Sequence, residues 1–408
     1  ACFIDLSQGR VLFAHLGEVF LQCKDRTSIK IDSVAFGGDG VGRVDDFVVF
    51  VPFAAPGDEL EIEITQRKKK FARGKISRVI NPSKTRVDPF CRHYGTCGGC
   101  CYQHINYEAQ LKIKKRQVAD AFEKIGGIPA PPVGEIIASP RIYHYRGKAR
   151  LHAAKSKLGF MDVSGAKVVD IERCEIVEET INARIGALRR DKTSLPHRAV
   201  EYAIWSGASA AADENELIIR EVQGKTFFVP REGFFQANLY LTEKLVEEVC
   251  RLSAATKVET LVDAYCGSGL FSVFLSGYAQ NIFGIEYDQA AVACARRDAA
   301  AAGANNVCFY AGDVENVLAD KFCSQEKPPD MVLLDPPRIG CSASVLRLLA
   351  RVLPRRIIYI SCNPATQARD VKFLCEQGYR LVSLLPLDMF SQTQHIEVIG
   401  VLEAIGKE

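Results

Sequence analysis

The sequence predicts an α/β protein whose carboxyl-terminal part, residues 236–408, forms a Rossmann-like, doubly wound and mostly parallel sheet. In this part, short runs of β-branched and aromatic residues alternate with amphipathic or alanine-rich runs of helical length. Ahead of it, residues 23–82 contain short strand-like segments separated by glycine turns, which is typical of a small β-barrel. We therefore expect an amino-terminal extension at 1–22, a barrel domain at 23–82, a central domain at 83–235 and the α/β domain at 236–408.

The composition of the 408 residues, with 48% hydrophobic and 25% charged, is that of a folded protein. No apolar run reaches the roughly 18 residues of a membrane span, and the amino terminus lacks a signal-peptide pattern. The 15 cysteines are odd in number and mostly scattered, which favours a reducing compartment over a disulfide framework. We expect a cytoplasmic protein without a membrane partner. Because one chain carries every predicted site, we expect a monomer.

The barrel segment is basic. Its predicted strand at 60–65 alternates strictly between apolar and polar residues, as a half-buried strand does. Residues 66–78 carry seven Lys or Arg side chains and no acid, and residues 112–116, including Lys114, form a second basic cluster. Most such runs lie on a solvated face, but they also mark nucleic-acid contacts. A small basic barrel is often an oligonucleotide-binding module, and a general interaction barrel is the alternative.

The order of strands and helices in the α/β part predicts where its ligands bind. The last two strands are joined by a loop without a helix, which predicts an antiparallel hairpin at one edge of the sheet. Strands are predicted at 258–265, 281–287, 331–335, 356–361, 379–387 and 396–402, and helices at 107–125, 238–252 and 288–302.

The loop after the first of these strands is glycine-rich. Gly267 and Gly269 allow a ligand to approach the backbone closely, and Tyr265 precedes them. Glu286 follows 19 positions after Gly267, at the end of the second strand, where an acid can accept hydrogen bonds from both ribose hydroxyls. The sequence therefore predicts a nucleotide-like cofactor, with an ordinary glycine turn as the alternative.

Two cofactors compete for this loop. A dinucleotide fingerprint requires a third glycine where this chain has Ser272. The amino and adenine groups of S-adenosylmethionine are donors, and they fit the ordered acids Asp263, Glu286 and Asp313 better.

Three further side chains are predicted at the same edge of the sheet. Cys362 ends a buried strand and is followed by an Asn-Pro breaker. Asp335 ends the preceding strand before two prolines, and Glu397 opens the last strand. A thiolate adds readily to electron-poor conjugated carbons, and a carboxylate can take a proton. A buried structural cysteine is the alternative, but these neighbours favour a nucleophile at Cys362.

A separate group of cysteines has the spacing of a metal site. Cys91-x5-Cys97-x2-Cys100 is followed at a distance by Cys174, and nearby glycines allow the backbone to wrap closely. Four thiolates suit either zinc or an iron–sulfur cluster, and the spacing does not choose between them or exclude a site without metal. Cys101 adjoins Cys100, but the Cys-x2-Cys register favours Cys100.

Five ordered motifs resemble those of the S-adenosylmethionine-dependent RNA uracil-5-methyltransferases, and the resemblance covers nearly the whole chain. The barrel looks like the TRAM domain of that family, an RNA-binding module. The motifs lie at residues 233–238, 263–269, 334–338, 361–366 and 388–397.

This resemblance implies a mechanism. Cys362 would add to carbon 6 of a flipped-out uracil, carbon 5 would take the methyl group, and Glu397 would remove the carbon 5 proton. Asp335 would hold the uracil edge, and Phe234 would also contact the substrate. Ser391 replaces a proline common in the family, which bears on the setting of Glu397. The implied S-adenosylmethionine site comprises Gln236, Tyr265, Gly267, Gly269, Glu286, Asp313 and Asp335.

The resemblance also favours a 4Fe–4S cluster on Cys91, Cys97, Cys100 and Cys174 over zinc. Relatives with both the barrel and the cluster mostly act on large-subunit ribosomal RNA, so 23S rRNA is favoured as the substrate over the T-loop of transfer RNA. A noncatalytic RNA-binding protein with a degenerate methyltransferase fold and a nicotinamide-dependent oxidoreductase are the alternatives.

Overall fold

The computed structural model folds into two compact units, Ala1–Val87 and Asp88–Glu408. The predicted boundary between residues 235 and 236 therefore falls inside the second unit. The described residues are 3–5, 10–12, 21–154, 156–190, 200–207, 217–254, 258–322 and 328–406.

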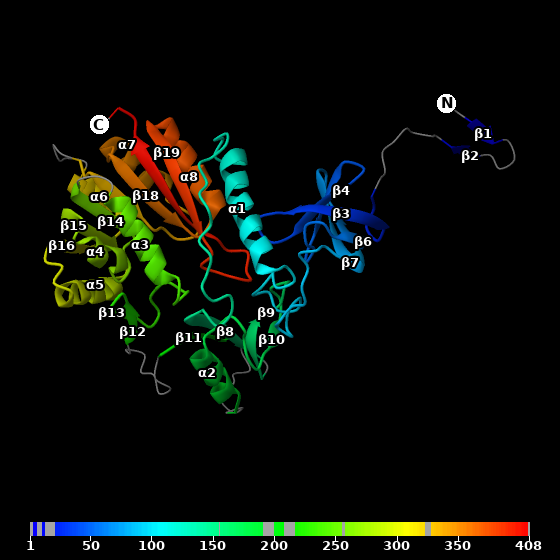
Figure 1. Ribbon diagram of the computed structural model, residues 1–408, viewed down its shortest axis with the longest axis horizontal. Coiled ribbons are helices and arrows are strands. Elements are labelled where there is room, and N and C mark those ends of the chain that lie inside the picture. Colours follow the sequence, from blue (N-terminus) through cyan, green and yellow to red (C-terminus); the bar gives the residue numbers. More distant parts are fainter. Residues whose placement is uncertain are drawn as a thin grey trace. The chain divides into compact units, whose positions relative to one another are not determined.

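The first unit contains a closed five-stranded barrel with the strand order β3-β4-β5-β7-β6 (Figure 1). Its core is aliphatic, with Val49, Val51 and Ile62 fully buried. Gly42 lets two strands cross closely, because a Cβ at this position would lie 2.2 Å from the carbonyl oxygen of Lys30. The predicted barrel is confirmed. Its strands are β3 (Arg26–Val34), β4 (Gly40–Val44), β5 (Phe47–Val51), β6 (Glu59–Arg67) and β7 (Phe71–Asn81), and β1 (Phe3–Asp5) pairs with β2 (Arg10–Leu12) ahead of them.

The second unit is built on a seven-stranded sheet with the order β16-β15-β14-β17-β18-β20-β19. The five strands from β16 to β18 are parallel, and β20 and β19 are antiparallel to their neighbours. The predicted hairpin at one edge is thus confirmed. The strands are β14 (Val258–Ala264), β15 (Ala279–Glu286), β16 (Val307–Ala311), β17 (Met331–Leu334), β18 (Arg356–Ser361), β19 (Tyr379–Leu387) and β20 (Glu397–Ala404).

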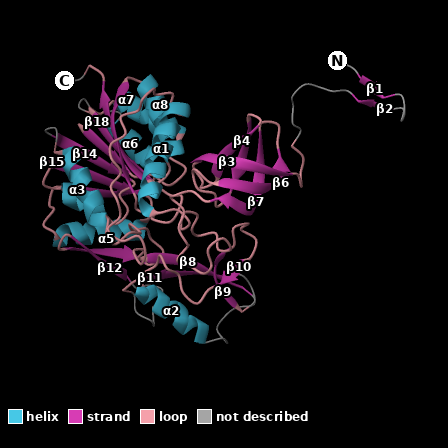
Figure 2. Cartoon of the chain, turned by 45° about the vertical axis from the view of Figure 1, so that its right-hand side comes forward, coloured by secondary structure: helices cyan, strands magenta, loops and turns pink. Residues whose placement is uncertain are grey.

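Helices cover this sheet in two groups, which lie on opposite sides of the strands in Figure 2. In one group, α4 packs between α3 and α5. In the other group, α6 packs on α7, α7 on α8, and α8 on α1. The sheet is consequently buried on both faces, as its continuous apolar strands require. The helices are α1 (Tyr107–Lys124), α3 (Thr242–Ser253), α4 (Leu270–Leu275), α5 (Gln289–Ala301), α6 (Val314–Phe322), α7 (Ala343–Val352) and α8 (Pro364–Glu376).

The central segment supplies a smaller antiparallel sheet, β10-β9-β8-β11, and a hairpin, β12–β13. The hairpin packs against α5, and its Phe227 and Val229 join the core of the large sheet. This core therefore begins earlier in the sequence than residue 236. The remaining elements are β8 (Lys148–Ala154), β9 (Lys157–Met161), β10 (Val168–Asp170), α2 (Glu179–Arg190), β11 (Val200–Trp205), β12 (Leu217–Val222) and β13 (Lys225–Pro230).

Lys114 corrects one expectation from the sequence. The basic cluster at 112–116 was expected on a solvated face, but the Lys114 side chain is fully buried in an ion pair with Asp388. Lys112 is exposed and Lys115 partly so. One member of the cluster thus belongs to the interior, because α1 turns that face toward the loop between β19 and β20.

No helix in the described part of the chain is both long and apolar enough to cross a membrane.

Candidate active site

The candidate active site lies at one edge of the seven-stranded sheet. From β14 the chain first adds β15 and then β16 on one side of the sheet. It then returns to add β17 and β18 on the other side of β14, so the strand order reverses at β14. Open α/β sheets bind their ligands at such a point, outside the carboxyl ends of the strands. β20 runs antiparallel, so its first residue reaches the same edge as the last residues of β17 and β18.

Cys362 is placed by the junction of β18 and α8. All six residues of β18 are buried, and the chain then turns at Asn363, whose side chain caps α8 by accepting a hydrogen bond from the Ala365 amide at 3.1 Å. Pro364 starts the helix, where its missing amide costs nothing. The thiol is thereby held on a short, rigid link between a strand and a helix.

Glu397 lies across the ladder from this thiol. β18 pairs with β20 so that Ser361 is opposite Val398, and the same register places Cys362 beside Glu397. The Glu397 side chain is 4% exposed. Burial raises its pKa well above the usual range, and the Asp335 carboxyl raises it further. Both effects favour the protonated form of Glu397 in the free protein.

Asp335 completes a group of acids around the thiol. It follows β17, and its Oδ2 lies 3.5 Å from the Nε2 of the buried Gln236. Burial and then the neighbouring Asp263 raise the pKa of Asp335. Ionised carboxylates this close repel one another, so a cationic ligand in this crevice would stabilise their ionised forms.

The environment of Cys362 keeps its thiol protonated in the free protein. Burial raises its pKa to about 12, with contributions from Glu397 and Asp335, whereas the guanidinium of Arg338 acts in the opposite direction. Arg338 comes from the loop after Asp335. The carbonyl oxygen of Arg338 accepts hydrogen bonds from the Asn363 and Thr366 side chains at 3.2 Å each. Arg338 is a site residue that the sequence motif contained but that we did not assign.

The glycine loop has the conformation of a binding loop. Tyr265, Gly267 and Gly269 all have positive φ values, of 67°, 54° and 81°, and a Cβ at Gly267 would meet nothing within 4 Å. Glu286 folds over the loop and accepts hydrogen bonds from the Gly267 amide at 3.0 Å and the Asp288 amide at 2.9 Å. The backbone thus turns toward open space beside a fixed carboxylate.

Asp313 lies next to this loop. It follows β16 and accepts a hydrogen bond from the Glu315 amide at 2.9 Å, at the start of α6. Its charge adds to the rise in the pKa of Tyr265, for which burial and Cys341 are the main causes.

Phe234 is 66% exposed, on the loop that leads to Gln236. The structure therefore gathers the predicted cofactor residues at the ends of β14, β15, β16 and β17, with Phe234 at the surface.

Asp263 has an unused acceptor that fits a cationic cofactor. It is fully buried, and its Oδ2 accepts a hydrogen bond from Ser272 at 2.5 Å, while its Oδ1 has no partner among the described residues. Burial raises the pKa of Asp263 to about 7. Ser272 was noted in the sequence only as a missing glycine, yet it anchors this acid.

Replacing Asp263 by asparagine is expected to change how stability depends on pH. A folded-state pKa raised above the unfolded value contributes stability at low pH that is lost as the pH rises through the folded pKa. Between about pH 4 and pH 8, the free energy of unfolding of the wild type should fall by roughly 2–4 kcal/mol relative to that of Asp263→Asn. Denaturant unfolding of the ligand-free proteins measures this difference. The exposed Asp320→Asn should follow the wild type. If the unfolding free energies of all three proteins changed with pH in parallel, the raised pKa of Asp263 would be contradicted.

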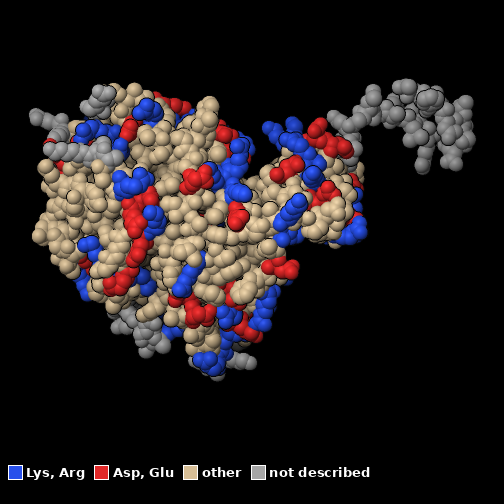
Figure 3. All heavy atoms as spheres, viewed as in Figure 1, with Lys and Arg blue, Asp and Glu red and all other residues tan. Residues whose placement is uncertain are grey.

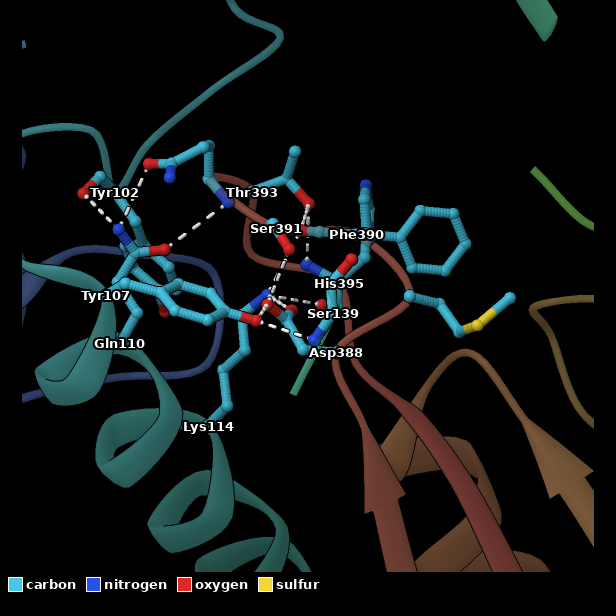
Figure 4. A network of polar contacts seen from close by, with 12 residues as sticks. Tyr102, Tyr107, Gln110, Lys114, Ser139, Asp388, Phe390, Ser391, Thr393 and His395 are labelled. Carbon is cyan, nitrogen blue, oxygen red and sulfur yellow. Dashed lines mark hydrogen bonds and ion pairs between the residues drawn. The ribbon is translucent and has the colours of Figure 1, made fainter. Parts of the chain in front are cut away.

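The loop between β19 and β20 is held by the central segment (Figure 4). Lys114 and Tyr107 of α1 both reach Asp388 at the start of this loop. His395, near its end, is partly buried and lies close to Arg338, Arg146 and Lys114. Burial first, and then these three cations, lower the pKa of His395 to about 4, so it is neutral at neutral pH.

The four cysteines of the predicted cluster, Cys91, Cys97, Cys100 and Cys174, line one cavity of about 170 Å³, and Cys101 does not line it. The loop that carries Cys91, Cys97 and Cys100 packs tightly against the end of β9, because a Cβ at Gly98 would lie 2.9 Å from the carbonyl oxygen of Asp162, the residue after β9.

This cavity is far larger than one water molecule needs. One water requires only roughly 10–15 Å³ by a comparable measure. Arg146, Arg150 and Glu175 also line the cavity, so charges of both signs lie beside the thiols. Among the described residues, no three Cys, His, Asp or Glu side chains are arranged to hold one metal ion.

Acidic side chains of the barrel compensate part of its basic run. Arg73 pairs with Asp39 at 2.7 Å and Lys75 with Glu63 at 3.0 Å. Figure 3 shows Lys, Arg, Asp and Glu side chains intermixed on the visible face of the molecule. The exposed residues 68–70, all lysines, are the part of the run for which no ion pair with the described residues is found.

Comparisons with known proteins agree with this geometry. The family model tRNA (Uracil-5-)-methyltransferase matches residues 214–405, and the TRAM domain model matches residues 26–77. An uncharacterized RNA methyltransferase of Porphyromonas gingivalis is 30% identical over 460 aligned positions, covering 92% of this chain and 99% of the relative. One of Clostridium tetani is 30% identical over 445 positions, covering 93% and 96%.

A solved structure shows the same arrangement. The tRNA (uracil-54, C5)-methyltransferase of Pyrococcus abyssi, in complex with S-adenosyl-L-homocysteine, superimposes with a TM-score of 0.68 at 25% identity, covering 92% of this chain and all of that chain. Fold and site together define an RNA methyltransferase with an amino-terminal TRAM barrel. The chain belongs to the RNA (uracil-5-)-methyltransferase family.

Proposed function

We propose that this enzyme transfers a methyl group from S-adenosylmethionine to carbon 5 of a uridine in RNA. The observation that carries the proposal is the register that sets Cys362 beside Glu397, with Asp335 on the adjoining strand. A nucleophile, a base and a hydrogen-bonding acid at one sheet edge are the groups that this reaction requires. The family membership supports the same reaction.

The residues of the cofactor site fit S-adenosylmethionine. The unpartnered Oδ1 of Asp263 and the other crevice acids suit its positive charge, and the open backbone at Gly267 leaves room for it. Glu286 and Asp313 would accept hydrogen bonds from its donors, and Tyr265 and Gln236 would line the site. When bound, this cofactor supplies an electrophilic methyl group.

The uracil first has to be activated, because its carbon 5 is a poor nucleophile. Cys362 adds to carbon 6 of a flipped-out uracil, and the ring electrons move to give an enolate. The thiol proton passes to solvent water before or during this addition, and the positive charge of Arg338 favours the thiolate that adds. Asp335 holds the polar edge of the ring, and Phe234, exposed at the surface, contacts the RNA.

Methyl transfer then leaves carbon 5 with both a methyl group and a proton. Glu397 removes this proton, the double bond re-forms, and the bond between carbon 6 and Cys362 breaks. Glu397 has to be ionised at this point, and positive charge in the crevice favours its ionisation. Because methyl transfer removes one positive charge, the pKa of Glu397 rises when it has to accept a proton.

The favoured substrate is 23S rRNA, because the barrel and the four-cysteine segment occur together in this chain as they do in the relatives that modify ribosomal RNA. The T-loop of transfer RNA is the second candidate, because the solved relative from Pyrococcus abyssi is a tRNA (uracil-54, C5)-methyltransferase. Mapping 5-methyluridine in total RNA from a deletion strain tests the proposal. Loss of one ribosomal site supports the first, loss of the T-loop site supports the second, and loss of neither contradicts both.

A 4Fe–4S cluster is proposed for Cys91, Cys97, Cys100 and Cys174, because four thiols line a cavity with room for a polyatomic group. Its role would be structural, since methyl transfer moves no net electrons. We also propose that the enzyme acts as a cytoplasmic monomer.

Protein purified without oxygen is expected to be brown and to contain about four iron atoms per chain. Cys100→Ser should lose most of this iron and absorbance, whereas Cys101→Ser should keep both, because Cys101 does not line the cavity. Visible spectroscopy and metal analysis measure the outcome. A colourless, zinc-loaded and active protein would refute the cluster.

A further inference from the structure

Lys114 is a charged residue in the interior of the second unit, away from the sheet edge. Its side chain is fully buried, and Nζ donates hydrogen bonds to Asp388 Oδ1 at 2.5 Å, the Phe390 carbonyl at 3.1 Å and the His395 carbonyl at 3.0 Å (Figure 4). An ammonium group has three hydrogens to donate, and all three are used. Every acceptor belongs to the loop at 388–396.

One face of α1 carries further contacts to this loop. Tyr107 donates to Asp388 Oδ2 at 2.8 Å, and the Gln110 and Gln392 side chains bond at 3.0 Å. Tyr107, Gln110 and Lys114 are three and four positions apart, so they lie on one side of the helix.

The middle of the loop is held in a conformation that it would not adopt alone. Gln392 has a φ of 69°, a region that residues other than glycine rarely adopt. Its carbonyl accepts hydrogen bonds from the Cys101 and Tyr102 amides at 3.1 Å each, and its own amide donates to Gln110 Oε1 at 3.3 Å. The central segment therefore determines the path of the loop.

This loop ends directly at Glu397, the first residue of β20. The Lys114 ammonium bonds the His395 carbonyl, two residues before Glu397. Cys362 belongs to the β18–α8 junction, so the two reacting groups are positioned by different parts of the chain. A change at Lys114 should displace the base and leave the nucleophile in place.

Resting on the proposed function, we infer that Lys114 is a positioning residue that sets Glu397 for proton removal from carbon 5. A buried ion pair adds little net stability compared with well-packed apolar residues, so its value here lies in geometry. The residue thereby links α1 of the central segment to one chemical step at the sheet edge.

Two RNA substrates separate that step from the earlier ones. RNA transcribed with 5-fluorouridine carries fluorine at carbon 5, so the covalent adduct forms and methylation occurs, but no proton can be removed. RNA with ordinary uridine requires proton removal for turnover. The probes are full-length 23S rRNA and transfer RNA transcripts, of which the one that the wild type methylates is used for all variants.

Lys114→Met is expected to form the 5-fluorouridine adduct at a rate within about threefold of the wild type. On uridine RNA its turnover should fall about 10- to 100-fold, and a methylated covalent adduct should accumulate, because small displacements of a reacting group are costly. Lys124→Met, a matched change at the exposed carboxyl end of α1 and outside the basic cluster, should alter neither rate.

Lys114→Met leaves the Asp388 carboxylate buried without its cation, so unfolding could hide the effect. The double variant Lys114→Met/Asp388→Asn removes both charges while the carbonyls of Phe390 and His395 still lose their donor. It should melt near the wild-type temperature and still accumulate the adduct. The inference is overturned if the folded double variant turns over uridine RNA like the wild type without accumulating the adduct. It is also overturned if adduct formation and turnover are slowed equally in either variant. If the wild type itself forms no adduct, the proposed function fails instead.

Discussion

Cys362→Ala is expected to abolish methyl transfer, lowering the rate by roughly 10⁴-fold or more. Without addition of a thiolate to carbon 6, carbon 5 of uracil stays a poor nucleophile, and no other group at the sheet edge can take this role. The Glu397 and Asp335 carboxyls beside the thiol are weaker nucleophiles, and burial raises the pKa of both, which favours their protonated forms. Transfer of labelled methyl groups to RNA measures the loss.

The same variant should form no covalent complex with 5-fluorouridine RNA on a denaturing gel. Cys375→Ala is the matched control, because Cys375 lies on α8 as a partly buried packing residue away from the sheet edge. This control should methylate and form the adduct like the wild type. An active Cys362→Ala protein would remove the nucleophile from the mechanism and return Cys362 to a structural role.

Glu397→Gln is expected to add the thiol and accept the methyl group, but to stall before the carbon 5 proton leaves. Glutamine has the shape of a protonated glutamic acid, so it keeps the packing at this 4% exposed position, yet it cannot accept a proton. General-base catalysis contributes about 10²–10⁴-fold, and turnover should fall by this factor. The accumulating species is a methylated RNA–protein adduct on ordinary uridine RNA, detected by mass spectrometry.

Glu403→Gln provides the comparison for this change. It lies on the same strand, β20, and pairs with Arg356 and Arg380 away from the catalytic edge. It should turn over normally without a trapped adduct. Normal turnover by Glu397→Gln would mean that another group removes the proton, and failure to form any adduct would assign Glu397 to an earlier step.

The strand ends of the α/β part could be predicted well from the sequence. Residues 357–360, shortly before Cys362, are all apolar or aromatic, and β18 occupies the expected residues, Arg356–Ser361. A buried parallel strand has to be apolar on both faces, so its limits are visible in composition alone. The residues just beyond such strands gather at one edge, which is why Cys362 and Asp335 could be assigned to the same crevice.

Contacts across the chain were harder to predict. Lys114 reads as one more lysine in a basic cluster, because burial of a lysine depends on a partner, and Asp388 lies 274 residues away. Ser272 reads as a missing glycine, and only the fold shows that it anchors Asp263. Arg338 was part of a recognised motif, but its effect on the Cys362 thiol depends on the turn that brings it back toward α8.

By itself, the sequence determined the kinds of element, their order and the reacting groups at their ends, because apolar periodicity and turn residues are local properties of the chain. The tertiary structure alone decided that Cys362 faces Glu397, that four cysteines from Cys91 to Cys174 line one cavity, and that Lys114 holds the loop before the base. Pairing register, cavity shape and the partner of a buried charge depend on residues far apart in sequence. Such contacts form only when the whole core packs.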